Sequence, residues 1–370
     1  MPSCATIINI IEKFAPKNLA FDWDNTGLQL GDYNKEVSKI LIVLTVTEDV
    51  IDYALNNGFE MIIAHHPLIF KPLKAVRKDF TIGRVIYKAI QKDLVIYSAH
   101  TNLDVAKDGV NDVLAQLLEL ERVEVLRETY TEPLKKITVF VPEGYEDKIV
   151  EAMGNAGAGF IGKYSNCTFK IRGEGTFKPE EGANPFIGKI GKLEKVNEFR
   201  IETIAPQSRV KSIISAMLKI HPYEEVAYDV YPLDNEGEKY GIGRVGYLSQ
   251  EMPLEDFALL VKNKLNVSNL KVVGELSKIV KKVAVCGGSG SDLINAAIFK
   301  NADVFVTGDV KYHDALDAFM QGIAVIDAGH SATEKVVLNK IKEHVEKSLC
   351  EMNQKAFIEV LIEKEIFNYV

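Results

Sequence analysis

The feature that most constrains the fold is an alternation of short apolar segments with segments of helical periodicity. It begins at the β-branched run Ile40–Val46 and continues to about residue 120. Strands and helices that alternate at this spacing predict a mainly parallel sheet covered on both faces. The expected strands are 40–46, 61–64 and 94–97, and the expected helices are 6–14, 48–57, 80–92 and 109–120. Residues 21–31, which are rich in Asp, Asn and Gly, are expected to form a loop.

The same alternation resumes after Gly241-Ile242-Gly243. A final helix carries Glu334, Leu338, Ile341 and Val345 on one face. The other expected elements are strands 271–274, 282–286, 303–306 and 323–326, helices 253–265, 293–300 and 312–320, and an edge strand within 357–362. Two stretches of the same α/β type therefore flank a central region.

The central region has a different residue pattern. Segments in which polar and apolar residues alternate lie around the expected helices 146–155 and 210–220. Alternation of polar and apolar residues is typical of antiparallel strands with one solvated face. We therefore predict an inserted α+β domain at residues 126–244. Residues 1–125 and 245–370 are predicted to form one α/β domain.

The net charge and the cysteine content indicate which partners and which cellular compartment to expect. The chain has 370 residues and a net charge of −8, which disfavours nucleic acid and anionic membranes as partners. Its four cysteines are scattered and form no CxxC pair. The first residues resemble no secretory signal, and no apolar run spans a bilayer. We expect a cytoplasmic protein that does not engage a membrane.

Two adjacent histidines, His65 and His66, follow the expected strand 61–64. Ligands of such sheets bind beyond the carboxyl ends of the strands. Pro67 restricts His66 to extended conformations, so the two imidazoles diverge and each can serve a different cation. The alternative is one hydrogen-bonded core histidine and one solvated histidine.

Two further strand ends carry a histidine with a carboxylate four residues later. These pairs are His100 with Asp104 and His330 with Glu334. The first pair is expected in a loop, where a turn that caps the next helix is the alternative. For the second pair, the alternative is that His330 caps a helix and Glu334 lies exposed in its first turn.

Taken together, the three strand ends favour a metal site. They supply four histidines and two carboxylates, ligands that suit zinc, iron or manganese. Two carboxylates offset only half the charge of two divalent cations, and the surplus would hold a bridging water or hydroxide. Two-metal sites with ions about 3.5–4 Å apart use such a nucleophile in hydrolysis.

Two more segments carry possible chemistry. Gly287-Gly288-Ser289-Gly290 precedes an expected helix and is either a weak anion site or a tight turn. In the segment 307–314, His313 is a candidate general acid or base, and Lys311 is a candidate contact for a substrate anion. Both side chains are equally compatible with the exposed start of a helix.

Several of these motifs resemble the Nif-three-like family, which is also labelled GTP cyclohydrolase 1 type 2. The matching motifs are Trp23-Asp24-Asn25-Thr26-Gly27-Leu28, Ala64-His65-His66-Pro67-Leu68, Ala99-His100-Thr101-Asn102-Leu103-Asp104, Thr307-Gly308-Asp309-Val310-Lys311-Tyr312-His313-Asp314 and Gly329-His330-Ser331-Ala332-Thr333-Glu334. The resemblance implies that the ligands of two divalent metal ions are His65, His66, Asp104, His330 and a bridging Glu334. It also implies that His100 and His313 line the site as catalytic residues.

The resemblance extends to the insert. His221–Asp229 is similar to a segment of the long members of the family, in which the insert forms a CutA-like or PII-like domain. It further implies a toroidal homohexamer whose sites face an interior cavity. The implied activity is metal-dependent hydrolysis, in which a metal-bound hydroxide attacks a nucleotide or another small anionic substrate. The alternative is a non-catalytic metal-binding regulator or metallochaperone.

Overall fold

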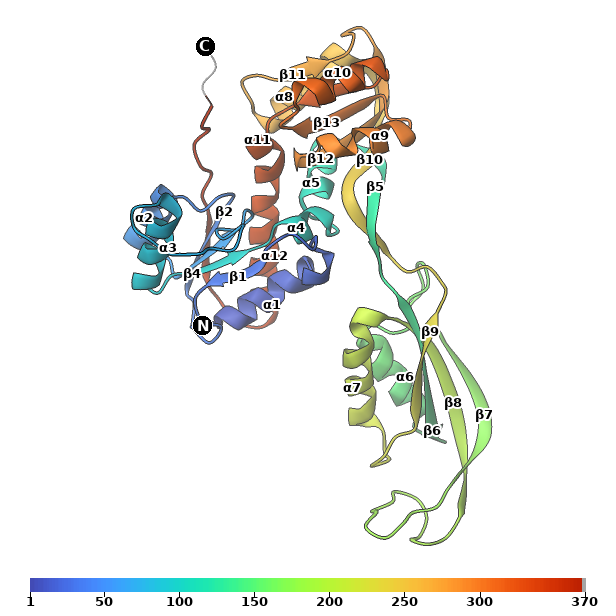
Figure 1. Ribbon diagram of the computed structural model, residues 1–370. Coiled ribbons are helices and arrows are strands. Elements are labelled where there is room, and N and C mark those ends of the chain that lie inside the picture. The colour runs from blue at the N-terminus through green and yellow to red at the C-terminus, as the bar shows by residue number, and fades with distance from the viewer. Residues whose placement is uncertain (368–370) are drawn as a thin grey trace. The chain divides into compact units, whose positions relative to one another are not determined.

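The computed structural model describes residues 1–367, and the chain forms two compact units (Figure 1). The units are Met1–Tyr130 with the segment from Tyr240 onward, and Thr131–Lys239. Two long strands, β5 (Glu121–Thr131) and β10 (Lys239–Pro253), carry the chain into and out of the second unit. The predicted domain edges at 126 and 244 lie inside these strands, where no loop marks a boundary. No helix among residues 1–367 has the length and apolarity needed to span a membrane.

The first unit contains two separate sheets rather than one. The first has the order β1-β4-β3-β2-β15, in which β15, β2, β3 and β4 are parallel and β1 is antiparallel to β4. Its elements, with the helices near it in the chain, are α1 (Cys4–Phe14), η1 (Lys17–Leu19), β1 (Gly27–Leu30), β2 (Lys39–Val43), α2 (Glu48–Asn56), β3 (Met61–Ala64), α3 (Thr81–Gln91), β4 (Val95–Ser98), α4 (Thr101–Val105), α5 (Val110–Leu117) and β15 (Phe357–Val360). The expected C-terminal edge strand is therefore confirmed.

Both faces of this first sheet are buried, as the apolar runs predict. Successive residues of a strand point to opposite faces. Ile40 and Ile42 of β2 pack into a core with residues of α1 and α12, and Leu41 and Val43 pack into another with residues of α2 and α3. Figure 1 shows these helix pairs on the two sides of the sheet.

The second sheet has the order β11-β14-β13-β12-β10-β5. Its centre, β12 to β14, is parallel, whereas β10 is antiparallel to β12 and β11 is antiparallel to β14. The remaining elements of this half are α8 (Leu254–Leu265), β11 (Lys271–Val273), β12 (Ile279–Ser289), η3 (Ser291–Leu293), α9 (Ile294–Phe299), β13 (Val304–Gly308), α10 (Tyr312–Met320), β14 (Ala324–Asp327), α11 (His330–Glu334), η4 (Lys335–Val337) and α12 (Leu338–Glu351). The antiparallel strands lie at or near the sheet edges, and the mainly parallel character is confirmed only for the central strands.

The second unit has the predicted α+β fold. Its four strands pair antiparallel in the order β7-β8-β6-β9, and Figure 1 shows both helices on one face of the sheet. Its elements are β6 (Leu134–Pro142), α6 (Glu146–Asn155), β7 (Thr168–Phe177), β8 (Glu194–Pro206), η2 (Gln207–Arg209), α7 (Val210–Ile220) and β9 (Tyr228–Leu233). Apolar residues of α6 and α7 pack on β6 and β8 to form its core. Likeness of this unit to CutA or PII stays a prediction.

Three local expectations are wrong. Residues 21–31 were expected as a loop but contain β1, whose pairing with β4 is too distant in sequence to be predicted from local composition. The segment 100–104 was expected as a loop but forms the short helix α4. Gly287 and Gly288 belong to β12 and not to a turn before a helix, because this strand continues to Ser289.

A buried ion pair fixes β10 to α5. The guanidinium of Arg244 donates two hydrogen bonds to the Asp112 carboxylate, at 2.6 and 2.8 Å, and others to nearby backbone carbonyls. Replacing Arg244 by Met should lower the free energy of unfolding by about 3–5 kcal/mol, because Asp112 loses its buried partner. Arg127→Met, which breaks an exposed pair with Asp292, should cost at most about 1 kcal/mol. Equal effects in urea denaturation would contradict this assignment.

Candidate metal centre

The histidines and carboxylates of the three strand ends come together in the first unit. His65 and His66 follow β3, and Asp104 lies in α4, shortly after β4. Because β3 and β4 are parallel neighbours, their carboxyl ends meet at one edge of the sheet. The helix α11 supplies His330 and Glu334 from its first and last residues.

Glu334 is the residue that joins the group. Its carboxylate is buried, and its two oxygens face different histidines. Oε1 lies 3.6 Å from His65 Nε2, whereas Oε2 lies 2.8 Å from His66 Nε2 and 3.1 Å from His330 Nε2. Asp104 Oδ1 also lies 3.6 Å from His65 Nε2. One carboxylate therefore connects a His65–Asp104 group to a His66–His330 group.

The ligand atoms form three sets whose members lie within 4.8 Å of one another. The sets are His65, Asp104 and Glu334; His66, His330 and Glu334; and His65, His66 and His100. Imidazole and carboxylate groups in sets of three are typical ligands of zinc, iron and manganese. The arrangement is therefore suited to binding metal.

Each of the four histidines is oriented by a hydrogen bond at its Nδ1 atom. The partners are the Ala99 carbonyl for His65 (2.9 Å), Thr45 Oγ1 for His66 (2.8 Å), Asp24 Oδ1 for His100 (2.9 Å) and Asp309 Oδ2 for His330 (2.7 Å). These contacts leave the Nε2 atom of each ring for the centre. Histidines that bind metals usually have their second nitrogen held in this way.

Two buried atoms in the centre have no hydrogen-bond partner, namely His65 Nε2 and Asp104 Oδ1. A buried polar atom without a partner costs free energy. Both atoms face the space beside Glu334, and both are of the kind that coordinates a divalent cation. The residues present therefore fit a metal site.

Proton affinities in the centre follow from the packing of opposite charges. Burial lowers the pKa of His65, but Asp104 and Glu334 outweigh it and raise the value to about 9. The hydrogen bond to Glu334 raises the pKa of His330 to about 9. Burial raises the pKa of Asp104 to about 6, and it lowers that of His66. The raised pKa values of His65 and His330 reflect the two buried carboxylates beside them.

The glycine-rich segment of β12 supports Glu334 and not an anion. Gly288 has a φ of +66°, and a Cβ atom there would lie 2.1 Å from Glu334 Oε1. Its N–H donates to Thr333 Oγ1 at 2.9 Å. The neighbouring Gly287 N–H donates to Asn111 Oδ1, and Asn111 in turn donates to the Asp104 carbonyl. A glycine at 288 leaves room for the Glu334 carboxylate, which occupies the space that a side chain at 288 would fill.

The two remaining sequence candidates, His313 and Lys311, are not members of these ligand sets. His313 is exposed near the start of α10, where its ring contacts Tyr312. Lys311, which precedes the same helix, is also exposed. A catalytic role for His313 stays a prediction.

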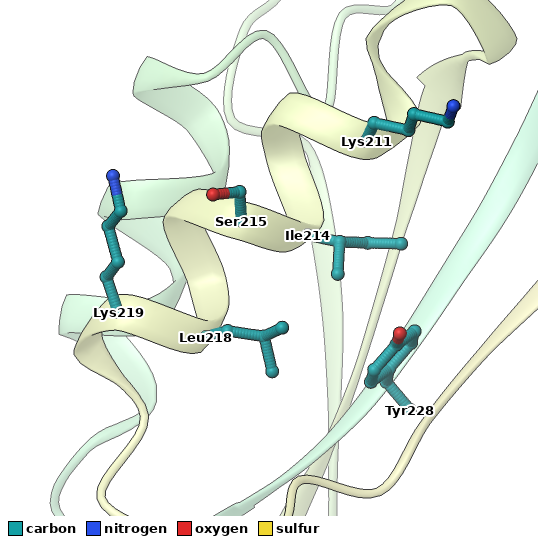
Figure 2. Close-up of a pocket in the computed structure, with 6 residues that line it drawn as sticks. All are labelled: Lys211, Ile214, Ser215, Leu218, Lys219 and Tyr228. Carbon is teal, nitrogen blue, oxygen red and sulfur yellow. The ribbon is translucent and has the colours of Figure 1, made fainter.

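A surface hollow on the second unit contains none of the predicted site residues. It is lined by side chains of α7 and by Tyr228 of β9. Figure 2 shows Ile214 and Leu218 pointing from α7 toward the Tyr228 ring, whereas Lys219 points away from it. The side chains that face Tyr228 are apolar, and the lining contains no histidine, cysteine or carboxylate that could bind a metal.

Three residues that orient the imidazoles have no role in the sequence-based predictions: Asp24, Thr45 and Asp309. Each lies more than 20 residues from its histidine, so spacing carries no signal. Asp24 and Asp309 do fall within the motifs that resemble the family. This position within a motif is the sequence signal that could have indicated their role. Burial raises the pKa of Asp24, but hydrogen bonds from His100 and Thr101 outweigh it and lower the value to about 2.

The Asp309→Asn variant should bind divalent cations about 10–100-fold more weakly than the unaltered protein. The carboxylate that orients His330 and raises its basicity is lost, although no proposed ligand is removed. Isothermal titration with Zn²⁺ measures the change. Asp314→Asn, which removes a charge at the first turn of α10, is the control. An unchanged affinity in Asp309→Asn would show that Asp309 does not support the centre.

The fold and the site define an α/β protein with a buried histidine–carboxylate cluster suited to divalent metals. The family described as Duf34/NIF3 (NGG1p interacting factor 3) matches residues 2–365. The chain belongs to this family.

Similar proteins cover nearly the whole chain. A protein of Halalkalibacterium halodurans named GTP cyclohydrolase 1 type 2 homolog is 52% identical over 93% of this chain and 92% of its own length. A Bacillus subtilis protein of the same name is 51% identical over 95% and 93%. The crystal structure of a Bacillus cereus protein related to NIF3 has a TM-score of 0.94 at 49% identity, covering 100% of this chain and 99% of that one.

Proposed function

We propose that this protein is a hydrolase that uses two divalent metal ions and acts on a nucleotide or another small anionic molecule. The observation that carries the proposal is the placement of the two Glu334 oxygens, one toward His65 and the other toward His66 and His330. His65, Asp104 and Glu334 would hold one ion, and His66, His330 and Glu334 the other. The names of the similar proteins support a nucleotide substrate.

Divalent ions in such a site act as Lewis acids and generate a nucleophile from water at neutral pH. The chain itself supplies the proton carrier. His100 lies beside the ligands, with its ring centroid 5.2 Å from that of His65 and 5.8 Å from that of His66. Asp24 holds its Nδ1 atom, so Nε2 is free to take up or release a proton at the reacting group.

The test is an assay of metal-loaded protein on GTP, other nucleotides and simple phosphoesters. Turnover should be lost in Glu334→Gln and should fall by about 100-fold or more in His100→Gln. Glu346→Gln, at an exposed position on α12, should behave like the unaltered protein. Stoichiometric metal binding with no turnover on any substrate would contradict the hydrolase.

A metallochaperone or metal-dependent regulator is the second candidate. The observation that favours it is the exposure of His330, whose side chain is 37% accessible, so that one ligand set is open to solvent. Such a protein should pass its metal to a chelator much faster than a buried structural site does. Retention of metal for hours in the presence of excess chelator would contradict this candidate.

We also propose a homohexamer, which the resemblance to the family supports. The expected mass in light scattering is about six times the 41.2 kDa of one chain. A monomer or dimer across a wide range of concentrations would contradict this assembly.

A further inference from the structure

Two large aromatic side chains lie exposed next to the metal centre. Trp23 is 61% exposed and Phe70 is 45% exposed, and their ring centroids are 5.9 Å apart with the planes at 72°. An exposed tryptophan leaves a large apolar area in water, and adjacent exposed aromatics commonly mark a binding surface. Neither side chain has a role in the metal site described above.

The ring of His100 completes a corner with these two. Its centroid lies 6.4 Å from that of Trp23 at 77°, and 6.3 Å from that of Phe70 at 88°. The rings of Trp23, Phe70 and His100 are therefore adjacent to one another and steeply inclined. Since His100 also belongs to a ligand set with His65 and His66, this aromatic corner adjoins the metal centre.

The aromatic corner is held in place by hydrogen bonds from its own segments. Asn25 Nδ2 donates to the Ile69 carbonyl at 2.5 Å, and the Ile69 N–H donates to Gln29 Oε1 at 3.2 Å. These bonds fasten the residues that follow Trp23 to the residue that precedes Phe70. Asp24, next to Trp23, accepts from His100 and Thr101. The rings are therefore positioned before any ligand binds, which reduces the entropic cost of binding.

We propose that the aromatic corner of Trp23, Phe70 and His100 binds a planar heteroaromatic ring of the substrate and sets its edge beside the metal centre. This proposal rests on the proposed function and names the substrate class, a nucleobase or a ring of similar chemistry. Aromatic side chains stack on any base because every base has a π-face. Lys71 and Lys74 follow Phe70 in the same exposed segment and match a substrate that also carries phosphate.

Trp23 is the only tryptophan of the chain, so its fluorescence reports on the corner directly. GTP, ATP and UTP should quench it with saturation, whereas inorganic tripolyphosphate of similar charge should not. Phe70→Leu should weaken GTP binding by about tenfold, the scale of one lost base–aromatic stack. Phe80→Leu, at an exposed phenylalanine outside the corner, is the matched control and should leave the affinity unchanged.

The proposal is overturned if none of the three nucleotides quenches, if tripolyphosphate competes as well as GTP, or if Phe70→Leu binds GTP as tightly as the unaltered protein. Calorimetry on Trp23→Leu, which should also bind GTP more weakly, gives a second measurement that needs no fluorescence.

Repeating the fluorescence titration with Glu334→Gln, in which turnover should be lost, separates the aromatic-corner proposal from the proposed hydrolase function. Saturable quenching without turnover on any substrate supports the aromatic corner while the hydrolase fails. Turnover of nucleotides that does not depend on Phe70 supports the hydrolase while the aromatic corner fails.

Discussion

In the Glu334→Gln variant, tight binding of divalent cations is expected to be lost at the two ligand sets that contain Glu334. The substitution keeps the size of the side chain but removes the one charge that faces His65 on one side and His66 and His330 on the other. Loss of an outer hydrogen-bond partner already weakens metal binding about 10–100-fold, so loss of a shared ligand should exceed about 100-fold. Titration calorimetry and metal content after dialysis measure the effect.

The control for this prediction is Glu346→Gln, which removes the same charge from an exposed position on α12. Metal binding to the folded state stabilises a protein in proportion to the logarithm of the ratio of metal concentration to Kd. Added Zn²⁺ should therefore raise the Tm of the unaltered protein and of Glu346→Gln, but not that of Glu334→Gln. A Tm rise of the same size in all three would mean that Glu334 is not a ligand.

The candidate ligands could be found from the sequence because each follows a short apolar strand. His65, His66 and Asp104 come after strands predicted from local composition, and parallel strands bring such residues to one edge. The four-residue spacing of His330 and Glu334 places both on one face of a helix. These signals lie in short stretches of sequence, and general rules of sheet and helix geometry convert them into positions in the fold.

What the sequence did not reveal depends on contacts between distant segments. The antiparallel pairing of β1 with β4 joins residues about 70 positions apart, and no local pattern indicates it. No local pattern indicates the role of Asp309 either, because that role depends on its contact with His330. The segment 287–289 has the composition of a turn, yet it belongs to β12, and Glu334 occupies the space beside Gly288.

This packing leads to the second large effect. In Gly288→Ala, the new methyl group would lie 2.1 Å from Glu334 Oε1, and the backbone would be held at a φ of +66°. The carboxylate is the end of a flexible side chain, so it can rotate away without unfolding the protein. A displaced Glu334 no longer faces both ligand sets, so metal affinity should fall by at least about tenfold.

Backbone strain alone must be separated from this displacement, and Gly322→Ala is suited to do so. Gly322 has a φ of +79°, but a Cβ atom there would meet nothing within 4 Å. Both variants should lose about 1–3 kcal/mol in the free energy of unfolding, because alanine is strained at a positive φ. Only Gly288→Ala should also weaken Zn²⁺ binding. If the two variants bind Zn²⁺ equally well, the close approach of Gly288 to Glu334 has no part in forming the site.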